Sequence, residues 1–381
     1  MNTVIVDPNG GSSATPATPQ RIMSNSNYFP ALDGLRGILA LGVITAHCNI
    51  AWFPGAPIMM ELFFVVSGFL ITSILLREVE KTGTVSLLKF WKRRLLRLSP
   101  ALVVAVSTTF VVSFFIVDDM WPILADGLSS ILYYSNWTKL YDYHYPTIFG
   151  QTWSLSIEEQ FYLIWPTLLT LVLFFRLRTY QIVFLLLLLA VVTTLWRHYL
   201  ISQEVPWSRV YYALETRMDA FVMGAILAMS FGVVRHWSHN TWWHYFLYAC
   251  SLALIVLFII GRPFEITYFI WQQSMAIVLS AAAILLLTSP RGGLLKRLCS
   301  SRVMVYLGER CYGLYLWHWP IIWLLLTETD VSKVTIVLIT FPLTILLSAL
   351  SYTYIEMPFL SKKPATLRAR KKSASVPVKP A

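Results

Sequence analysis

The stretch QIVFLLLLLAVVTTLW at residues 181–196 decides the fold class of this chain. It is apolar almost throughout, and the run from Leu185 to Leu189 shows no alternation of polar and apolar residues. A strand of a membrane barrel would need that alternation, because its residues face lipid and lumen in turn. A helix of about 20 apolar residues instead covers a hydrocarbon core of ~30 Å. The stretch therefore predicts a membrane-spanning helix.

Comparable apolar stretches occur along the whole chain. The ten predicted spans are 33–52, 58–76, 100–117, 157–175, 181–196, 216–232, 242–260, 268–287, 305–326 and 333–352. The composition agrees with this pattern, because 57% of residues are hydrophobic, 13% are charged and the mean hydropathy is +0.63, far from the average soluble domain. We predict an all-α integral membrane protein, a polytopic bundle of about ten transmembrane helices.

Lysine and arginine are distributed unevenly between the two sides of this bundle. The segments 77–99, 176–180, 233–241 and 288–303, together with both tails, hold 22 of the 30 such residues, and the loops of the other side hold five. Because positively charged loops tend to stay in the cytoplasm, we predict cytoplasmic N- and C-termini. The net charge of +11 then reflects topology and contact with anionic lipid, and no nucleic-acid partner is expected.

The two ends of the chain differ in composition from its centre. Residues 1–27 are rich in Ser, Thr, Pro and Gly and lack the apolar core of a secretory signal peptide, so they predict a disordered tail. Residues 361–381 predict a basic cytoplasmic tail, and residues 28–360 a single membrane domain. No motif for a phosphate loop, a dinucleotide or a zinc protease occurs. The four cysteines fit no CxxC pattern, and we expect no metal site.

The first span carries three acidic or basic residues. An ionisable residue near the middle of a bilayer costs ~2.5–3.5 kcal/mol on insertion scales, so it needs a partner, a cavity or a function. Besides Asp33, the span carries Arg36 and His47, whose spacing of eleven residues places them on one helix face and ~16 Å apart along the axis. The two can line one path across the membrane. The alternative is that Arg36 reaches the interface and His47 satisfies a helix contact.

A pair of arginines lies on the cytoplasmic side. Arg94 and Arg97 are three residues apart, so in a helix they present two forked donors on one face, which suits phosphate groups. Acyl-CoA carries a 3′-phosphate and a pyrophosphate, and we predict that Arg94 and Arg97, together with Arg36 of the first span, hold these phosphates at the cytoplasmic side. The alternative is that both arginines serve only as topology signals.

An acid with a neighbouring hydroxyl opens the fourth span. Ser154 and Glu158 are four residues apart and share a helix face, whereas Glu159 points about 100° away. We predict that Glu158 is the functional acid. The alternative is a structural ion pair of Glu158 with Arg217 or Arg209.

Two histidines lie deep in predicted spans. Transfer to a hydroxyl requires a base with a pKa near neutrality close to the acyl carbonyl, and His47 is the predicted general base. His318 is followed by Trp319-Pro320, which fits a supporting role, a kink or a substrate wall. Glu61 opens the second span near the outer interface, and with Glu158 it is expected to orient His47 or to bind the acceptor.

Six stretches, in this order and spacing, resemble the membrane acyltransferase 3 family. They are residues 32–37 leading to His47, 63–72, 93–97, 153–158, 217–224 and 313–320. The resemblance spans roughly residues 28–360. It implies O-acylation of surface polysaccharides, lipopolysaccharide, nodulation factors or macrolides, with acyl-CoA as co-substrate, acetyl as the expected group and no tightly bound cofactor. It also implies that five residues belong to the family's conserved positions: Arg36, His47, Arg94, Arg97 and Glu158.

Together these features predict an enzyme of the cell membrane, taken to be a bacterial inner membrane, that moves an acyl group from cytoplasmic acyl-CoA to a saccharide or glycosylated acceptor. Direct transfer and an acyl-histidine intermediate both remain open. Many relatives carry an added extracytoplasmic hydrolase-like domain, so transfer is expected within the membrane domain or with a separate partner. A proton-coupled transporter or exporter of a polar solute is the alternative, but the sequence lacks the two related halves typical of one. A purely structural subunit of an export complex would leave the buried charges unexplained.

Overall fold

A computed structural model describes residues 28–48, 55–141, 148–237, 240–262 and 265–361. Within these ranges the chain forms helices and no strand, which confirms the predicted all-α class. Eight helical segments of the described chain are long and apolar enough to cross a membrane. The predicted tails lie outside the described residues, apart from the last helical residues before 362.

The helices follow one another with short connections. The first half of the chain contains α1 (Pro30–His47), η1 (Ala56–Ile58), α2 (Met59–Thr82), α3 (Leu87–Phe114), α4 (Trp121–Ile131), α5 (Ser135–Tyr141), η2 (Gly150–Thr152), α6 (Trp153–Phe174) and α7 (Thr179–Ser202). The second half contains α8 (Trp207–Tyr211), α9 (Met218–His236), α10 (Thr241–Ile260), η4 (Tyr268–Gln272), α11 (Gln273–Thr288), α12 (Gly293–Cys299), α13 (Arg302–Glu309), α14 (Cys311–Glu328), α15 (Lys333–Leu350), η5 (Ser351–Glu356) and α16 (Met357–Ser361).

The predicted spans differ from these helices in three ways. Helix α3 begins at Leu87, well before the predicted start at residue 100, because Leu, Lys and Arg are good helix formers and the charged turns continue into water. The predicted span 305–326 is divided at Arg310 into α13 and α14. Of the ten predicted spans, the two that match α1 and α14 are not among the eight apolar segments. Both helices carry the polar side chains on which the functional prediction rests.

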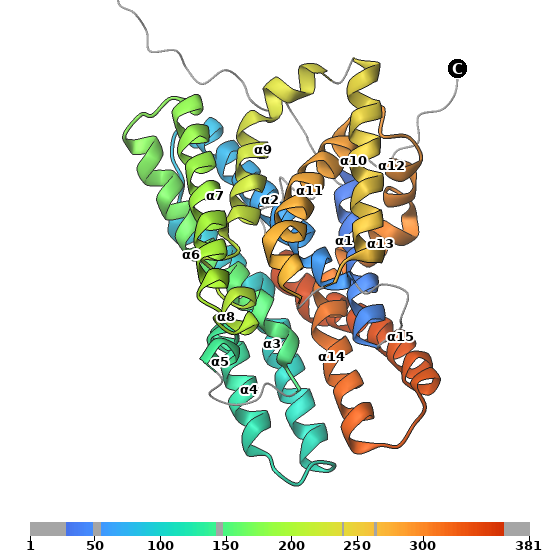
Figure 1. The fold of residues 1–381 in the computed structure, drawn as a ribbon. Helices are drawn as coiled ribbons and strands as arrows, with labels where there is room; N and C mark the ends of the chain where they lie inside the picture. Colours follow the sequence, from blue (N-terminus) through green and yellow to red (C-terminus); the bar gives the residue numbers. More distant parts are fainter. Residues whose placement is uncertain (1–27, 49–54, 142–147, 238–239, 263–264, 362–381) are drawn as a thin grey trace, which may run out of the picture.

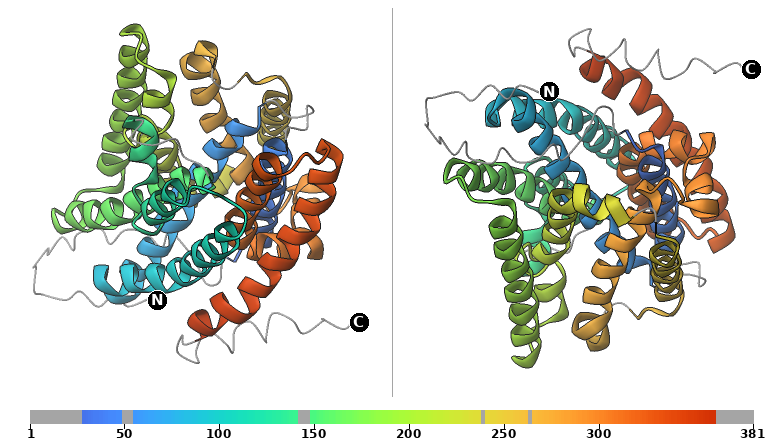
Figure 2. Two further views of the ribbon diagram at one scale, coloured as in Figure 1. Left: turned by 90° about the horizontal axis from the view of Figure 1, so that it is seen from below. Right: turned by 90° about the horizontal axis from the view of Figure 1, so that it is seen from above.

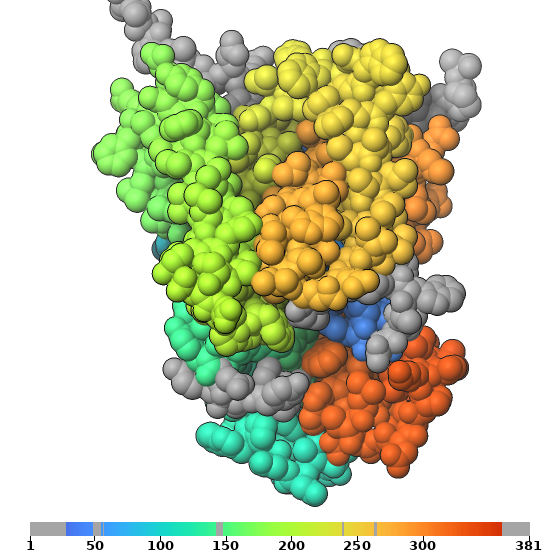
Figure 3. Space-filling model, in the orientation of Figure 1, coloured from blue at the N-terminus to red at the C-terminus, as the bar shows by residue number. Residues whose placement is uncertain are grey.

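The helices pack as a bundle whose two ends differ (Figures 1 and 2). The α9–α10 turn and α12 lie at one end, while α4 and the α14–α15 turn project at the other, and the space-filling view shows these projections clearly (Figure 3). Helix α1 is surrounded by α2, α11, α12, α13 and α14. The polar residues of α1 therefore face protein rather than lipid.

Helices α2 and α9 cross at close distance, with glycines at the crossing point. A Cβ atom added to Gly68 of α2 would overlap the carbonyl oxygen of Phe221, and one added to Gly224 of α9 would overlap that of Val65. Small residues let helices approach closely in membranes, where dispersion contacts replace the hydrophobic driving force. Gly68 and Gly224 are therefore positions where a larger side chain would prevent this close approach.

Candidate active site

Two histidines from distant parts of the chain meet between α1 and α14. His47 Nδ1 lies 2.8 Å from His318 Nε2, and the ring planes are parallel within 4°. Trp319 packs edge-on against His47, with ring centroids 4.8 Å apart. His318 is fully buried, whereas His47 is only half-buried. The last residue of α1 is thus more accessible than its partner, which is fully buried inside the bundle.

A tyrosine one turn before His318 connects this pair to α6. The Tyr315 ring lies 5.6 Å from the His318 ring, and its hydroxyl is 2.5 Å from Ser154 Oγ. The same hydroxyl donates to the carbonyl oxygen of Gln151. Ser154, which the sequence predicted beside the site, is therefore joined to the histidines through Tyr315.

Glu158 lies one turn further along α6. Its Oε1 accepts a hydrogen bond of 2.5 Å from Ser67 of α2. The alternative ion pairs do not form, because Arg217 pairs with Glu61 and Arg209 with Glu215. Glu158 also interacts electrostatically with Arg36 and Arg94. Its carboxylate thus lies within electrostatic range of both Tyr315 and the arginines.

Three arginines gather at the other end of this arrangement. Arg94 pairs with Glu159 at 2.9 Å and lies over the Tyr162 ring at 3.9 Å. Arg36 and Arg97 lie within electrostatic range of each other, and within the described residues neither forms an ion pair. Arg36 and Arg97 are therefore the cations left available for an anionic ligand, while Arg94 is partly neutralised.

Helices α1 and α14 run in the same direction through this region. Cys311, at the start of α14, lies beside Arg36, and His318 further along α14 meets His47 at the end of α1. Because α1 is continuous from Pro30 to His47, the arginine and the histidine are separated by ~16 Å along the axis. We call the group of polar side chains between them the polar path: Arg36, Glu158, Ser67, Ser154, Tyr315, His318 and His47. Glu158 lies within electrostatic range of Arg36 and Tyr315, and direct contacts run from Ser154 through Tyr315 and His318 to His47.

Asp33 and Glu61 lie beside the polar path rather than in it. Asp33 interacts with Arg36 and accepts a hydrogen bond from Tyr28. Glu61 forms an ion pair with Arg217 in which both side chains are fully buried. Tyr268 donates to Glu61 at 2.8 Å and accepts from Arg217 at 3.1 Å. Glu61 is therefore committed to a structural pair, and the predicted contact with the acceptor has no support in its geometry.

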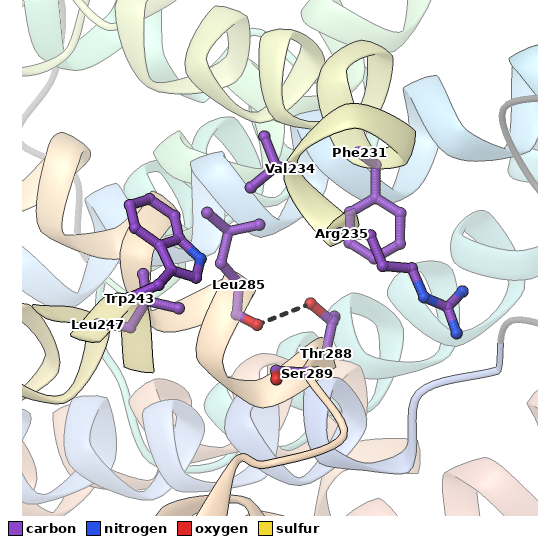
Figure 4. A pocket seen from close by; sticks show the side chains of 8 residues that line it. All are labelled: Phe231, Val234, Arg235, Trp243, Leu247, Leu285, Thr288 and Ser289. Carbon is purple, nitrogen blue, oxygen red and sulfur yellow. Dashed lines mark hydrogen bonds between the residues drawn. The ribbon is translucent and has the colours of Figure 1, made fainter. Parts of the chain in front are cut away.

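A small cavity lies away from the polar path, between α9, α10 and α11 (Figure 4). Its lining residues are Phe231, Val234, Arg235, Trp243, Leu247, Leu285, Thr288 and Ser289. The volume of about 20 Å³ is close to that of a single water molecule. None of the predicted site residues lines it, so it does not mark the active site.

Tyr315, Ser67 and Glu159 are contacts that the sequence analysis did not assign. Tyr315 stands three residues before His318, and that spacing places both on one face of α14, which was a usable signal. The hydrogen bond of Ser67 to Glu158 joins α2 to α6, so it depends on how these two helices pack. Arg94 of α3 pairs with Glu159 of α6 rather than with Glu158. This choice depends on how the two helices cross, so it cannot be predicted from residue spacing within either helix.

Comparison with known proteins assigns the chain to a family. A sequence profile described as an acyltransferase domain matches residues 29–353, and the chain belongs to this family. No solved structure matches the chain.

Three relatives have names that describe their activity. The chain is 33% identical to a putative peptidoglycan O-acetyltransferase YrhL of Bacillus subtilis over 353 residues, and 31% identical to peptidoglycan O-acetyltransferase OatA of Listeria monocytogenes over 350 residues. A putative O-acetyltransferase of Staphylococcus aureus is 32% identical over 357 residues. Each match covers 87% of this chain but only 55–57% of the relative. The chain thus spans little more than half the length of these relatives. Membership of an acyltransferase family does not favour the transporter alternative.

Proposed function

We propose that this protein is a membrane O-acetyltransferase that takes an acetyl group from acyl-CoA at the arginine end of the polar path and transfers it to an acceptor hydroxyl at the histidine end. The observation that carries the proposal is the polar path itself, with Arg36 and the neighbouring Arg97 at one end and half-buried His47 at the other. Among the described residues neither arginine forms an ion pair. Phosphate groups favour forked guanidinium donors. The distribution of Lys and Arg supports a cytoplasmic location for the arginine end.

The chemical step needs only groups that the polar path supplies. His47 accepts the proton of the acceptor hydroxyl as its oxygen attacks the thioester carbonyl, and the C–S bond then breaks. The leaving thiolate takes the proton back from His47, so the products are the ester and the free thiol of CoA. A base of this kind contributes ~10²–10⁴-fold to the rate. An acyl-histidine intermediate is a variant of the same scheme in which His47 itself attacks the thioester.

A carbohydrate is the acceptor class that the relatives support. Two of them are named for peptidoglycan, so a hydroxyl of a cell-wall glycan is the first acceptor to test, in the cell membrane of a bacterium. Lipopolysaccharide, which the resemblance allowed, has no support in these names. Because the relatives are longer than the region matched, the acceptor can also be a carrier group on a second domain or protein.

The test uses the full chain in lipid nanodiscs with labelled acetyl-CoA and soluble peptidoglycan fragments. We expect label transfer by the wild-type protein and no transfer above background by His47→Ala. Donor binding by the variant should stay within a few fold of wild type, because the phosphates are assigned to arginines ~16 Å away along α1. Retained transfer by well-folded His47→Ala would exclude His47 as the base. Rapid quenching without acceptor would show label on His47 only if the acyl-histidine variant operates.

A further inference from the structure

The contacts of His318 determine which of its ring nitrogens carries a proton. Its Nδ1 lies 3.1 Å from the carbonyl oxygen of Leu314, four residues earlier in α14. A carbonyl oxygen can only accept a hydrogen bond, so Nδ1 of His318 must be the protonated nitrogen. In a neutral imidazole the other nitrogen is then an acceptor. Nε2 of His318 therefore presents a lone pair toward His47.

His318 is best described as neutral in this environment. Its side chain is fully buried, and among the described residues the groups that act on it are backbone groups of Leu314 and Tyr315, with no carboxylate. Among the described residues, the titratable groups that act on His47 are His318 and the more distant cation Lys139. A buried cation without an anionic partner is strongly disfavoured. The neutral form with Nδ1 protonated is therefore the one consistent with both contacts.

The lone pair of His318 in turn selects the form of His47. Because the two nitrogens are 2.8 Å apart, Nδ1 of His47 must donate to Nε2 of His318. The rings are parallel within 4° and meet at their edges, where N–H groups and lone pairs point. Nε2 of His47 is thereby left unprotonated, on the residue of the pair that is only half-buried.

We propose that His318 is a positioning residue that fixes His47 in the tautomer with a free Nε2, and that this nitrogen is the base that acts on the acceptor hydroxyl. The inference rests on the proposed function. In many hydrolases a carboxylate orients the catalytic imidazole in this way. Here a neutral imidazole does so, which avoids placing an anion in the buried interior. The hydrogen bond from Nδ1 would also stabilise the imidazolium that forms when Nε2 accepts the proton.

Two substitutions of His318 separate its two hydrogen bonds. In His318→Asn the side-chain amide can still donate to Leu314 but is too short to reach His47. In His318→Gln the longer side chain places an amide oxygen near the position of Nε2, where it can accept from His47. We expect His318→Gln to keep kcat within about tenfold of wild type, and His318→Asn to lower kcat by ~10²-fold or more, which is the scale of losing an oriented base.

The Michaelis constant for acetyl-CoA should stay the same in both variants, because neither touches the arginines. His244→Leu is the matched control. His244 is also buried and bridges Asn240 and Ser289. Because Ser289 lines the small cavity away from the polar path, loss of His244 should leave kcat unchanged. Equal kcat for His318→Asn and His318→Gln, with both proteins folded, would overturn the positioning role.

A spectroscopic measurement tests the tautomer without relying on activity. Solid-state NMR of protein with ¹⁵N-labelled histidine in nanodiscs distinguishes Nδ1–H from Nε2–H imidazole, and the His47→Ala spectrum assigns the signal. We expect Nδ1–H for His47 in wild type and Nε2–H, the form favoured in water, in His318→Leu. Nε2–H in the wild-type protein would overturn the inference even if acetyl transfer is confirmed. Activity of His47→Ala would instead refute the proposed function while the NMR result stood.

Discussion

At the scale of single residues, the arginines near the proposed donor site differ in whether they form an ion pair with an acidic side chain. Arg36 and Arg97 have no ion-pair partner among the described residues, whereas Arg94 pairs with Glu159 and exposed Arg93 with Glu78. The sequence predicted Arg36, Arg94 and Arg97 as phosphate-binding residues, since it could show the common face of Arg94 and Arg97 but not the acid opposite Arg94. Because Arg94 pairs with Glu159, Arg36 and Arg97 are the first of the three to test.

The arginines can be ranked by substitution. A charge-assisted hydrogen bond is worth ~1.5–3 kcal/mol, so Arg36→Ala and Arg97→Ala should each raise the KM for acetyl-CoA by about 10- to 100-fold. Lysine should restore only part of the affinity, because an ammonium cannot reproduce the fork. Steady-state kinetics in nanodiscs measures the change. Arg93→Ala is the control and should leave KM unchanged, and an equal rise in that variant would assign the effect to general surface charge.

The buried pair of Glu61 and Arg217 should dominate the stability of its region. Removing one partner leaves a charge buried without compensation, at a cost of about 3–5 kcal/mol. We expect Arg217→Met to lower the thermal midpoint of the purified protein sharply, and Glu61→Met with Arg217→Met together to lower it less. Arg209→Ala removes the more exposed pair with Glu215 and should change the midpoint little. A larger loss in the double variant would refute this account.

At the scale of helices, hydrophobic length predicted most of the bundle but not its irregularities. The spans 242–260 and 333–352 lie close to α10 and α15, because ~20 apolar residues have few alternatives in lipid. The break at Arg310 was missed, since the apolar residues on both sides suggest one continuous helix. The short helices α4, α5 and α8 were missed because five to eleven residues give too weak a periodic signal. The polar path was predicted in part, since spacing within one helix placed Arg36 and His47 but could not pair His47 with His318.

The crossing of α2 and α9 gives a prediction at this scale. Gly68→Ala adds a methyl group where the backbone of Phe221 already lies, and overpacking of this kind costs about 1–3 kcal/mol. We expect a lower thermal midpoint and lower yield of inserted protein. Gly42→Ala is the matched control, because its methyl group would meet only the flexible end of the Met59 side chain. Equal behaviour of the two variants would mean that α2 and α9 can separate at little cost.

At the scale of the whole molecule, the proposed reaction depends on which end faces the cytoplasm. Cysteine labelling of intact cells can decide this, because three of the four natural cysteines are buried. Asp118, between α3 and α4, and Thr84, between α2 and α3, are both exposed. We expect Asp118→Cys to react with a membrane-impermeant maleimide on intact cells, and Thr84→Cys to react only after lysis. The reverse pattern would place the arginine end outside, away from acyl-CoA.

The ion pair between Glu61 and Arg217 joins segments that are synthesised far apart in time. At ~5–20 residues per second, the ribosome makes Arg217 roughly 8 to 30 s after Glu61. During that interval α2 has neither the cation nor the glycine-bearing face of α9 beside it. The nascent chain must therefore hold its acid at the membrane surface, in protonated form, or in the shelter of the insertion machinery until α9 arrives. Assembly of this bundle is consequently ordered by translation, and a chain released before α9 should be recognised as unfinished and degraded.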